Sequence, residues 1–333
     1  MIPTIDIAVT DASQVGEARR AALRIAADRA FDETACGRIA LIVTELGTNL
    51  VRHAKAGRLL IDCRDSAGER RIDILSMDSG PGMADVGRCL RDGYSSGGTP
   101  GNGLGAVQRL STDFSVFSAV GEGTVILSRT RAPAPGGPQA PPHFAYAGLC
   151  LAVSGETISG DAWDIRLDAG RAAVIVADGL GHGPAASEAS GAALATFAAA
   201  RGSPSAVLER AHAAMRATRG AAVAIAEVDA LAATVLFAGA GNIAGRMISG
   251  IEDRVLMSQH GTLGVQIRKL QDAPYAWPEH ALIVLHSDGL TTRWNLKDAG
   301  GLLRCDPAVV AGWLLRDHAR GRDDATVVVL KRV

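Results

Sequence analysis

The sequence predicts two domains, an N-terminal α/β sandwich and a C-terminal α+β domain built as an antiparallel β-sandwich flanked by helices. At 333 residues the chain is longer than one ordinary hydrophobic core requires. A segment rich in proline and glycine, "RAPAPGGPQAPP", interrupts it at residues 131–142. Before this segment strands and helices are mixed, and after it short strands dominate. We therefore expect a first domain at 1–131, a linker at 132–143 and a second domain at 144–333.

The composition excludes several classes of function. With 34 basic and 35 acidic residues the formal net charge is −1, and no basic block offers a surface to nucleic acid or to an anionic membrane. The N-terminus reaches Asp6 without the basic region of a signal peptide, and no apolar stretch is long enough to span a membrane. The five cysteines include no C-x-x-C pair, which is typical of a reducing compartment. We expect a cytoplasmic protein.

The first domain is expected to run strand, two helices, hairpin, helix, hairpin. A short strand covers 5–9, and a helix covers 11–30, where Asp11 and Gln14 have the spacing of a capping box. A second helix covers about 33–54. Further strands are expected at 58–64, 69–77, 113–118 and 123–130, with another helix from about 104.

The second helix, "GRIALIVTELGTNLVRHA", carries a polar stripe beside its apolar face. At 100° per residue, Glu45, Asn49 and His53 fall within about 80° of one another. An ordinary solvated pair is one interpretation of Glu45 and Asn49. The other is a proton acceptor one turn from a neutral oxygen ligand for Mg²⁺, which a nucleotide site needs.

Two later stretches suit a nucleotide site. In "LSMDSGPGM" a strand ends at Asp78 and the chain bends at Gly80 and Gly82, so that a carboxylate can meet a ring amine beside bare backbone. "GGTPGNGLGAVQRL" places three glycines before a helix start, where free N–H groups and the helix dipole favour phosphate: Gly101, Gly103 and Gly105. The same stretch fits a dinucleotide pattern, but "DGYSSGGTP" precedes it where that motif requires a strand, so NAD is disfavoured.

The stretches "TELGTNLVRHA", "DSGPGM", "GNGLGAVQRL" and "GEGTV", in this order, resemble the motifs of the GHKL (Bergerat) ATP-binding fold. More narrowly they resemble the bacterial anti-sigma-factor serine kinases of the RsbW and RsbT type. The resemblance implies that Asn49 holds the Mg²⁺ of ATP, Asp78 binds the adenine amine, and Glu45 is the catalytic base toward a partner's hydroxyl group. It further implies that Gly80, Gly82 and Thr124 line the adenine ring of ATP. The glycines Gly101, Gly103 and Gly105 would line its phosphates.

The second domain should consist mainly of strands, several of which end in an acid. The strands are expected near 146–153, 162–168, 171–177, 221–228, 231–238, 281–287 and 325–330, with helices near 184–200 and 204–218. The acids are Asp161, Asp178, Asp288, Asp323 and Asp324. The pairs Asp178–Gly179 and Asp288–Gly289 could each be a simple turn.

A shared site is the other interpretation of these acids. If the fold gathers them, their repulsion raises the pKa values unless a cation is present, and ligands that are all oxygen select Mg²⁺ or Mn²⁺. Two such ions about 4 Å apart activate water and clamp a phosphoryl group, which is the chemistry of phosphate-ester hydrolysis. Gly179 would let its backbone carbonyl approach an ion.

These stretches, together with "AGAGNIAG" and "HGTLGV", resemble the SpoIIE and RsbX branch of the metal-dependent protein phosphatases. The resemblance implies that Asp178 bridges two ions and that Asp178 and Asp288 are catalytic. The ion ligands it implies are Asp161 and the Gly179 carbonyl on one side, and Asp288 and Asp323 on the other. Asp324 is expected to cap the last strand. Whether His182 reaches the leaving group stays open. The larger phosphatases have a phosphate-binding arginine near the first of these acids, and this sequence has no clear counterpart to it near Asp161.

Together these inferences predict a bifunctional partner-switching regulator. The first domain would use ATP with Mg²⁺ to phosphorylate Ser or Thr on a STAS-domain anti-sigma antagonist, and the second, with two Mn²⁺ or Mg²⁺ ions, would remove the phosphate and thereby control a sigma factor. Two alternatives remain. The first domain could bind ATP and partner without phosphotransfer, or the protein could sequester a sigma factor directly. A homodimer is left open.

Overall fold

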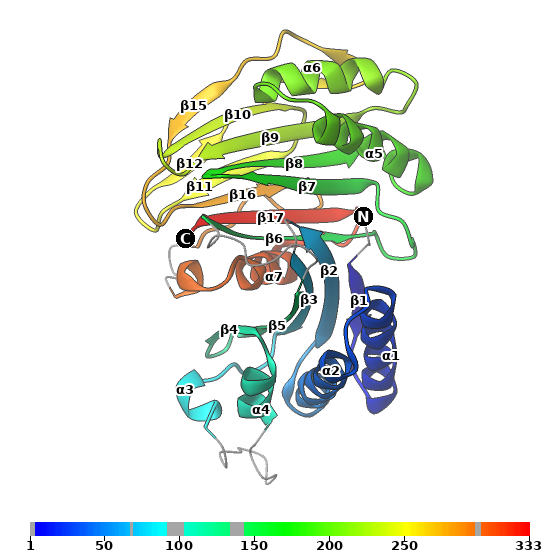
Figure 1. Cartoon of the computed structure of the whole chain (residues 1–333), viewed down its shortest axis with the longest axis vertical. Helices are drawn as coiled ribbons and strands as arrows, with labels where there is room; N and C mark the ends of the chain where they lie inside the picture. Colours follow the sequence, from blue (N-terminus) through cyan, green and yellow to red (C-terminus); the bar gives the residue numbers. More distant parts are fainter. Residues whose placement is uncertain (1–3, 67–68, 92–102, 134–142, 297–300) are drawn as a thin grey trace. The chain divides into compact units, whose positions relative to one another are not determined.

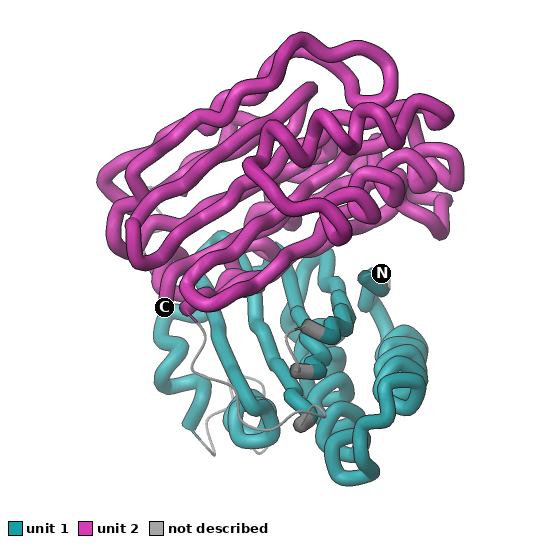
Figure 2. Tube along the Cα trace, turned by 45° about the horizontal axis from the view of Figure 1, so that its top comes forward, with its two compact units in different colours: residues 1–140 teal, residues 141–333 magenta. Residues whose placement is uncertain are grey.

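The chain divides into two compact units, Met1–Ala140 and Pro141–Val333 (Figure 2). The computed structural model describes residues 4–66, 69–91, 103–133, 143–296 and 301–333. Each unit encloses a hydrophobic core of its own, which confirms the predicted organisation in two domains.

Unit 1 is a five-stranded antiparallel sheet with helices packed on one face (Figure 1). Its strands are β1 (Ile5–Ala8), β2 (Arg58–Ser66), β3 (Glu69–Asp78), β4 (Asp113–Ala119) and β5 (Gly123–Pro133), in the spatial order β1-β2-β3-β5-β4. Its helices are α1 (Ala12–Asp28), α2 (Glu33–His53), α3 (Val86–Cys89) and α4 (Gly103–Leu110). The arrangement is the predicted α/β sandwich.

Local sequence explains how the two long helices of unit 1 begin and which faces they bury. Asp11 accepts the N–H of Ser13 at 2.7 Å, and Gln14 completes the predicted capping box. Asp32 accepts the N–H of Ala35 at 2.7 Å and caps α2. The apolar stripes of both helices pack on β1, β2 and β3, which leaves the polar stripe of α2 outside the core.

Unit 2 is a sandwich of two five-stranded antiparallel sheets. The first sheet consists, in spatial order, of β15 (Ala273–Ala276), β10 (Thr234–Ala240), β9 (Ala221–Asp229), β8 (Arg171–Gly179) and β7 (Asp161–Asp168). The second consists of β12 (Asp253–Leu256), β11 (Ala244–Ile248), β16 (Leu282–His286), β17 (Ala325–Arg332) and β6 (Phe144–Leu151). A small ribbon of β13 (Gly261–Thr262) and β14 (Gln266–Ile267) is added.

Helices flank this sandwich as predicted. The helices α5 (Pro184–Ala199) and α6 (Pro204–Ala214) bury one apolar face against β8 and β9 of the first sheet. Pro184 and Pro204 each occupy the first turn of their helix, where no backbone N–H is needed. The short 3₁₀ helix η1 (Leu302–Arg304) leads into α7 (Pro307–His318), which packs on β17 and β6. None of the helices in the described ranges is long and apolar enough to cross a membrane.

Helix α7 was not predicted, and its burial explains why. Every residue from Pro307 to Leu315 is buried, so "PAVVAGWLL" is apolar all round and lacks the 3.6-residue alternation that marks a surface helix. The strands β11, β12 and β15, each of four or five residues, were also missed.

Two predicted boundaries are wrong. The linker does not begin at residue 132, because β5 continues to Pro133 and pairs with β3 there; a proline is tolerated at a strand end, where its missing N–H costs little. The remainder of the predicted linker lies largely outside the described residues. The strand expected at 231–238 begins at Thr234, because Asp229 accepts the N–H groups of Leu231 and Ala232 and closes a turn.

Candidate functional sites

In unit 1 the polar stripe of α2 faces the first residue of α4. A Cβ placed on Gly103 would lie 3.0 Å from Glu45 Oε2 and 3.8 Å from both carboxamide atoms of Asn49. Glu45 and Asn49 are half-buried. The stripe therefore does not simply face solvent, because its carboxylate and carboxamide meet the N-terminal end of a helix, where backbone N–H groups are free to bind an anion.

The turn after β3 brings Asp78 close to Thr124. The two residues are paired across β3 and β5, and Asp78 Oδ1 accepts the N–H of Gly80 at 2.7 Å. The hydroxyl groups of Thr124 and Ser118 are 2.8 Å apart. Asp78 is half-buried at this edge of the sheet, where its carboxyl can meet a polar ring substituent.

The glycines of this turn are needed because backbone packs against backbone. Gly82 has φ +68°, and a Cβ there would lie 2.0 Å from the carbonyl oxygen of Ala119. A Cβ on Gly80 would lie 3.0 Å from the His53 carbonyl at the end of α2. The vacant side of each glycine thus faces protein, whereas we expected it to face the base. Glycine here fixes the position of Asp78 between α2 and the β4–β5 hairpin.

The phosphate side is described only in part. Gly103 and Gly105 form the first turn of α4, and Gly105 is buried. Gly101 lies outside the described residues.

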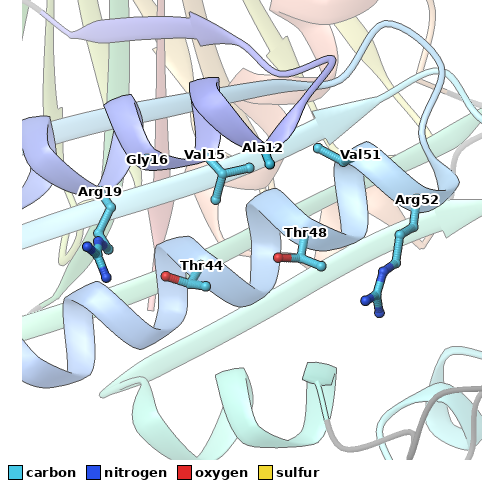
Figure 3. Close-up of a pocket in the computed structure, with 8 residues that line it drawn as sticks. All are labelled: Ala12, Val15, Gly16, Arg19, Thr44, Thr48, Val51 and Arg52. Carbon is cyan, nitrogen blue, oxygen red and sulfur yellow. The ribbon is translucent and has the colours of Figure 1, made fainter.

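A cavity of about 440 Å³ lies between α1 and α2 (Figure 3). It is lined by Ala12, Val15, Gly16, Arg19, Thr44, Thr48, Val51 and Arg52. Thr44 and Thr48 each directly precede a residue of the polar stripe, but no predicted ATP-binding residue lines this cavity. It is therefore separate from the residues that we expected to bind ATP.

In unit 2 four strand ends bring the acids to one end of the sandwich. Asp161 begins β7 and is paired directly with Asp178 near the end of β8. Asp288 follows β16, and Asp323 precedes β17, the neighbour of β16. Residues far apart in the sequence thus meet because antiparallel neighbours start and stop at the same edge.

The two Asp-Gly pairs differ in backbone structure. Asp178 and Gly179 belong to β8 and are paired with β9, so the turn interpretation is wrong there. Asp288 and Gly289 do form a turn, closed by a hydrogen bond from the Leu290 N–H to the Ser287 carbonyl at 3.3 Å.

Both glycines are needed for close packing. A Cβ on Gly289 would lie 1.9 Å from the Asp324 carbonyl oxygen, and one on Gly179 would lie 2.1 Å from the Ala186 carbonyl oxygen of α5. The first contact presses the Asp288 turn onto the chain just before β17. Gly179 therefore has a packing reason beyond the metal approach that we expected.

Mutual repulsion marks the acidic end. Burial, followed by the charges of Asp288, Asp323 and Asp324, raises the pKa of Asp178 to about 7. Burial and the neighbouring Asp178 also raise the pKa of Asp161 well above its ordinary value. The carboxylates are therefore close enough to repel one another, and a bound cation would reduce this repulsion.

The donor chemistry of this end fits hard divalent ions. Every candidate ligand is a carboxylate or carbonyl oxygen, the type that Mg²⁺ and Mn²⁺ prefer. Across the described ranges, however, no three His, Cys, Asp or Glu side chains are arranged so that they could hold one ion. The acids lie close enough to repel one another without converging on a single point.

Sequence reasoning missed two side chains that hold the acids in place. Ser287 Oγ donates to Asp161 Oδ2 at 2.6 Å and accepts the N–H of Thr326 at 3.0 Å, so it ties β7 to β16 and β17. Asn242 Nδ2 donates to Asp288 Oδ2 at 2.6 Å. Ser287 directly precedes the pair Asp288–Gly289, and Asn242 lies within "AGAGNIAG". Their hydrogen-bonding side chains were the available signal.

Asp324 was expected to cap the last strand, but its carboxylate binds the loop between β6 and β7 instead. Its carboxylate accepts the N–H groups of Val153 and Gly160, each at 2.7 Å, and so fixes the loop between β6 and β7. His182, in the loop after β8, has its Nδ1 2.9 Å from Glu156 Oε1, and the preceding Leu180 is exposed.

The chain resembles known proteins in both units. Residues 8–129 match the family described as "Histidine kinase-like ATPase domain", and residues 168–333 match that of "Stage II sporulation protein E (SpoIIE)". The serine/threonine-protein kinase RsbT of Bacillus subtilis (strain 168) is 34% identical over 109 residues, which are 33% of this chain and 82% of RsbT.

Two solved structures resemble the chain over more than half its length. One, described as "The bacterial stressosome: a modular system that has been adapted to control secondary messenger signaling", is 26% identical with a TM-score of 0.54 and covers 56% of this chain and 99% of its own. The crystal structure of RsbX in complex with magnesium is 22% identical with a TM-score of 0.51, covers 59% and 98%, and shares the fold.

Proposed function

Because this chain joins a member of the RsbT kinase family to a member of the SpoIIE phosphatase family, we propose that it is a bifunctional regulator. One unit phosphorylates Ser or Thr on a small regulatory protein with ATP, and the other removes that phosphate. The partner is a STAS-domain anti-sigma antagonist, and its phosphorylation controls a sigma factor. Five free cysteines suit the reducing cytoplasm, where ATP is available.

In the kinase unit the residues of α2 and the β3 turn divide the work. Asp78 accepts a hydrogen bond from the amine group of adenine. Asn49 supplies an oxygen ligand to Mg²⁺, which neutralises phosphate charge when bound. Glu45, next to the start of α4, accepts the proton of the partner's hydroxyl group. Transfer depends mainly on this positioning, as is usual for phosphoryl transfer.

In the phosphatase unit the residues at the acidic end hold ions and fix one another. Asp178, Asp161, Asp288, Asp323 and the Gly179 carbonyl are the proposed ligands. Two Mn²⁺ or Mg²⁺ ions, when bound, lower the pKa of water and neutralise phosphoryl charge. Ser287 and Asn242 orient the carboxylates of Asp161 and Asp288 through their hydrogen bonds.

One observation carries the proposal for the phosphatase: four strand ends, separated by up to 162 positions from Asp161 to Asp323, bring carboxylates together, and burial and the neighbouring charges raise the pKa values of Asp161 and Asp178. A structural cluster would pair such acids with basic side chains, whereas none of these acids forms an ion pair within the described part of the chain. Perturbed carboxylates of this kind are typical of functional sites.

A labelling experiment tests both activities in the full-length chain. Asp178→Asn protein is incubated with Mg²⁺, γ-³²P-ATP and a STAS-domain protein from the same genome, so that transferred label is not removed. We expect label on the partner, and rapid loss of that label after wild-type protein and Mn²⁺ are added. The double variant with Glu45→Gln should bind ATP but transfer at least about a hundredfold more slowly.

The outcomes separate the alternatives. An unlabelled partner together with bound ATP supports a binding module in unit 1 and refutes the kinase. Label that persists after wild-type protein and Mn²⁺ are added refutes the phosphatase. A stable complex with a sigma factor, without any transfer, supports direct sequestration.

A further inference from the structure

An arginine lies beside the acidic end of unit 2 on the chain that enters β9. Asp178 is paired with Ala222 and Gly179 with Ala221. The Leu180 N–H continues this register by donating to the Gly220 carbonyl at 3.0 Å. Arg219 directly precedes Gly220 on the chain that enters β9, and it lies opposite the turn that leaves β8.

The guanidinium of Arg219 lies over this turn. A Cβ on Gly181 would lie 3.4 Å from Arg219 Nη1, so glycine leaves space for the arginine head. On its other side the Gly181 carbonyl lies 3.2 Å from the Cβ position of Gly160, which itself is 3.0 Å from Asp324 Oδ2. Gly181 thus lies between the Arg219 guanidinium on one side and Gly160, whose N–H donates to Asp324 Oδ2, on the other.

The backbone at Arg219 is held firmly, while its side chain is not. Gly220 has φ +87°, and a Cβ there would lie 2.6 Å from the Leu263 carbonyl, so the turn into β9 has little freedom. Arg219 is exposed, and within the described part of the chain it has no hydrogen-bond or ion-pair partner. A rigid backbone that carries a guanidinium with unoccupied, coplanar N–H donors suits an anion that accepts two hydrogen bonds at once.

We propose that Arg219 binds the phosphoryl group of the substrate. It would take the place of the phosphate-binding arginine that has no clear counterpart near Asp161. This inference rests on the phosphatase function proposed above. Hydrolysis breaks the ester P–O bond and forms one to a water oxygen, and the alcohol leaves with a proton from that water. The phosphoryl group keeps about two negative charges throughout the reaction, and the nearby carboxylates repel it. A guanidinium beside it offsets this repulsion in the bound substrate, during hydrolysis and in the bound product.

Arg320 is the competing cation. Its backbone N–H donates to the Gly289 carbonyl at 2.8 Å, which places it next to the Asp288 turn. Arg216 offers a matched control, because it is exposed and lies on the same connection between α6 and β9 as Arg219.

The test uses the full-length chain saturated with Mn²⁺. Inorganic phosphate is titrated by calorimetry into the wild type, Arg219→Ala, Arg219→Lys, Arg320→Ala and Arg216→Ala. We expect Arg219→Ala to weaken phosphate binding about ten- to hundredfold. Arg219→Lys, which keeps the charge but not the fork, should fall between, and Arg216→Ala should stay within twofold. The KM for p-nitrophenyl phosphate should rise in the same order.

Each outcome decides the role of Arg219. Phosphate binding that is unchanged in Arg219→Ala, absent from the wild type or lost in Arg320→Ala instead overturns the inference. Mn²⁺ binding, followed by electron paramagnetic resonance, should be the same in wild type and Arg219→Ala; a loss of Mn²⁺ there would overturn it too. A wild-type chain that binds phosphate but does not hydrolyse p-nitrophenyl phosphate refutes the phosphatase, and the titration still decides the role of Arg219.

Discussion

The two units position their polar groups by different means. In unit 1 the position of Asp78 depends on backbone packing, since the chain around it leaves no space for side chains at Gly82 and Gly123. In unit 2 the acids are also packed closely, and burial together with the repulsion of neighbouring acids raises the pKa of Asp178 to about 7. Unit 2 therefore holds an unfavourable repulsion between acids that a bound divalent cation would relieve.

This difference predicts which changes each unit senses. Removing a charge should strongly change the activity of the proposed site in unit 2. Replacing a tightly packed glycine by alanine should lower the stability of whichever unit contains that glycine. The four tryptophans, Trp163, Trp277, Trp294 and Trp313, all belong to unit 2. Tryptophan fluorescence therefore follows unit 2, and far-UV circular dichroism follows both units.

The largest effect is expected from Asp178→Asn. Removing this carboxylate should lower phosphatase turnover with Mn²⁺ about a thousandfold, equivalent to about 4 kcal/mol of activation free energy. ATP binding by unit 1 should stay within twofold of the wild type. Hydrolysis of p-nitrophenyl phosphate and equilibrium binding of a fluorescent ATP analogue measure the two quantities. Retention of more than a tenth of the phosphatase activity would remove Asp178 from the proposed site.

Gly289→Ala should be the most damaging glycine change in unit 2. Its Cβ would lie 1.9 Å from the Asp324 carbonyl, so the Asp288 turn must move, at a cost of about 3 kcal/mol. Urea unfolding followed by tryptophan fluorescence measures the change. Gly191→Ala is the matched control, because this exposed position in α5 has nothing within 4 Å, and alanine there should stabilise unit 2 by about 0.5–1 kcal/mol. Equal effects of the two changes would refute the packing explanation.

A pair of glycines in the β4–β5 hairpin sharpens the comparison in unit 1. Gly121 and Gly123 have φ +83° and +84°, but only a Cβ on Gly123 meets a neighbour, the Asp78 carbonyl at 2.0 Å. Gly121→Ala should cost about 1 kcal/mol from the positive φ alone. Gly123→Ala should cost at least about 1 kcal/mol more and weaken ATP binding, because Asp78 is displaced. If both variants bind ATP alike, the position of Asp78 does not matter to the nucleotide.

The last prediction concerns the pH dependence of unit 2. The folded chain keeps the Asp178 proton up to about pH 7, whereas the unfolded chain loses it near the ordinary aspartate pKa of 3.8, so metal-free stability falls as the pH rises from about 4 to 7. Stabilisation by Mn²⁺ should grow by about 1–2 kcal/mol between pH 6 and 8, as protons cease to compete. Thermal unfolding followed by tryptophan fluorescence measures this.

Asp178→Asn is the control for the pH dependence. The variant should be more stable than the metal-free wild type at pH 8, because the repulsion is relieved, and it should gain little from Mn²⁺. A stabilisation by Mn²⁺ that falls with rising pH in the wild type would contradict the assigned direction.

The sequence by itself determined the two-domain organisation, most strands and helices, and which residues are the candidates for both proposed sites. The stripe of Glu45 and Asn49 follows from helical periodicity, and the acids stand where apolar runs stop, so local pattern was sufficient for both. Helix α7 escaped because complete burial removes the alternation that identifies a helix.

Only the tertiary structure decided how the acids meet. Gly289 lies against Asp324, Ser287 joins Asp161 to the start of β17, and Asn242 holds Asp288; each contact joins segments that are distant in sequence. Local pattern shows which face of a strand a residue occupies but not which strand becomes its neighbour. That pairing depends on closing long loops and packing two sheets, and the pKa of Asp178 follows from it.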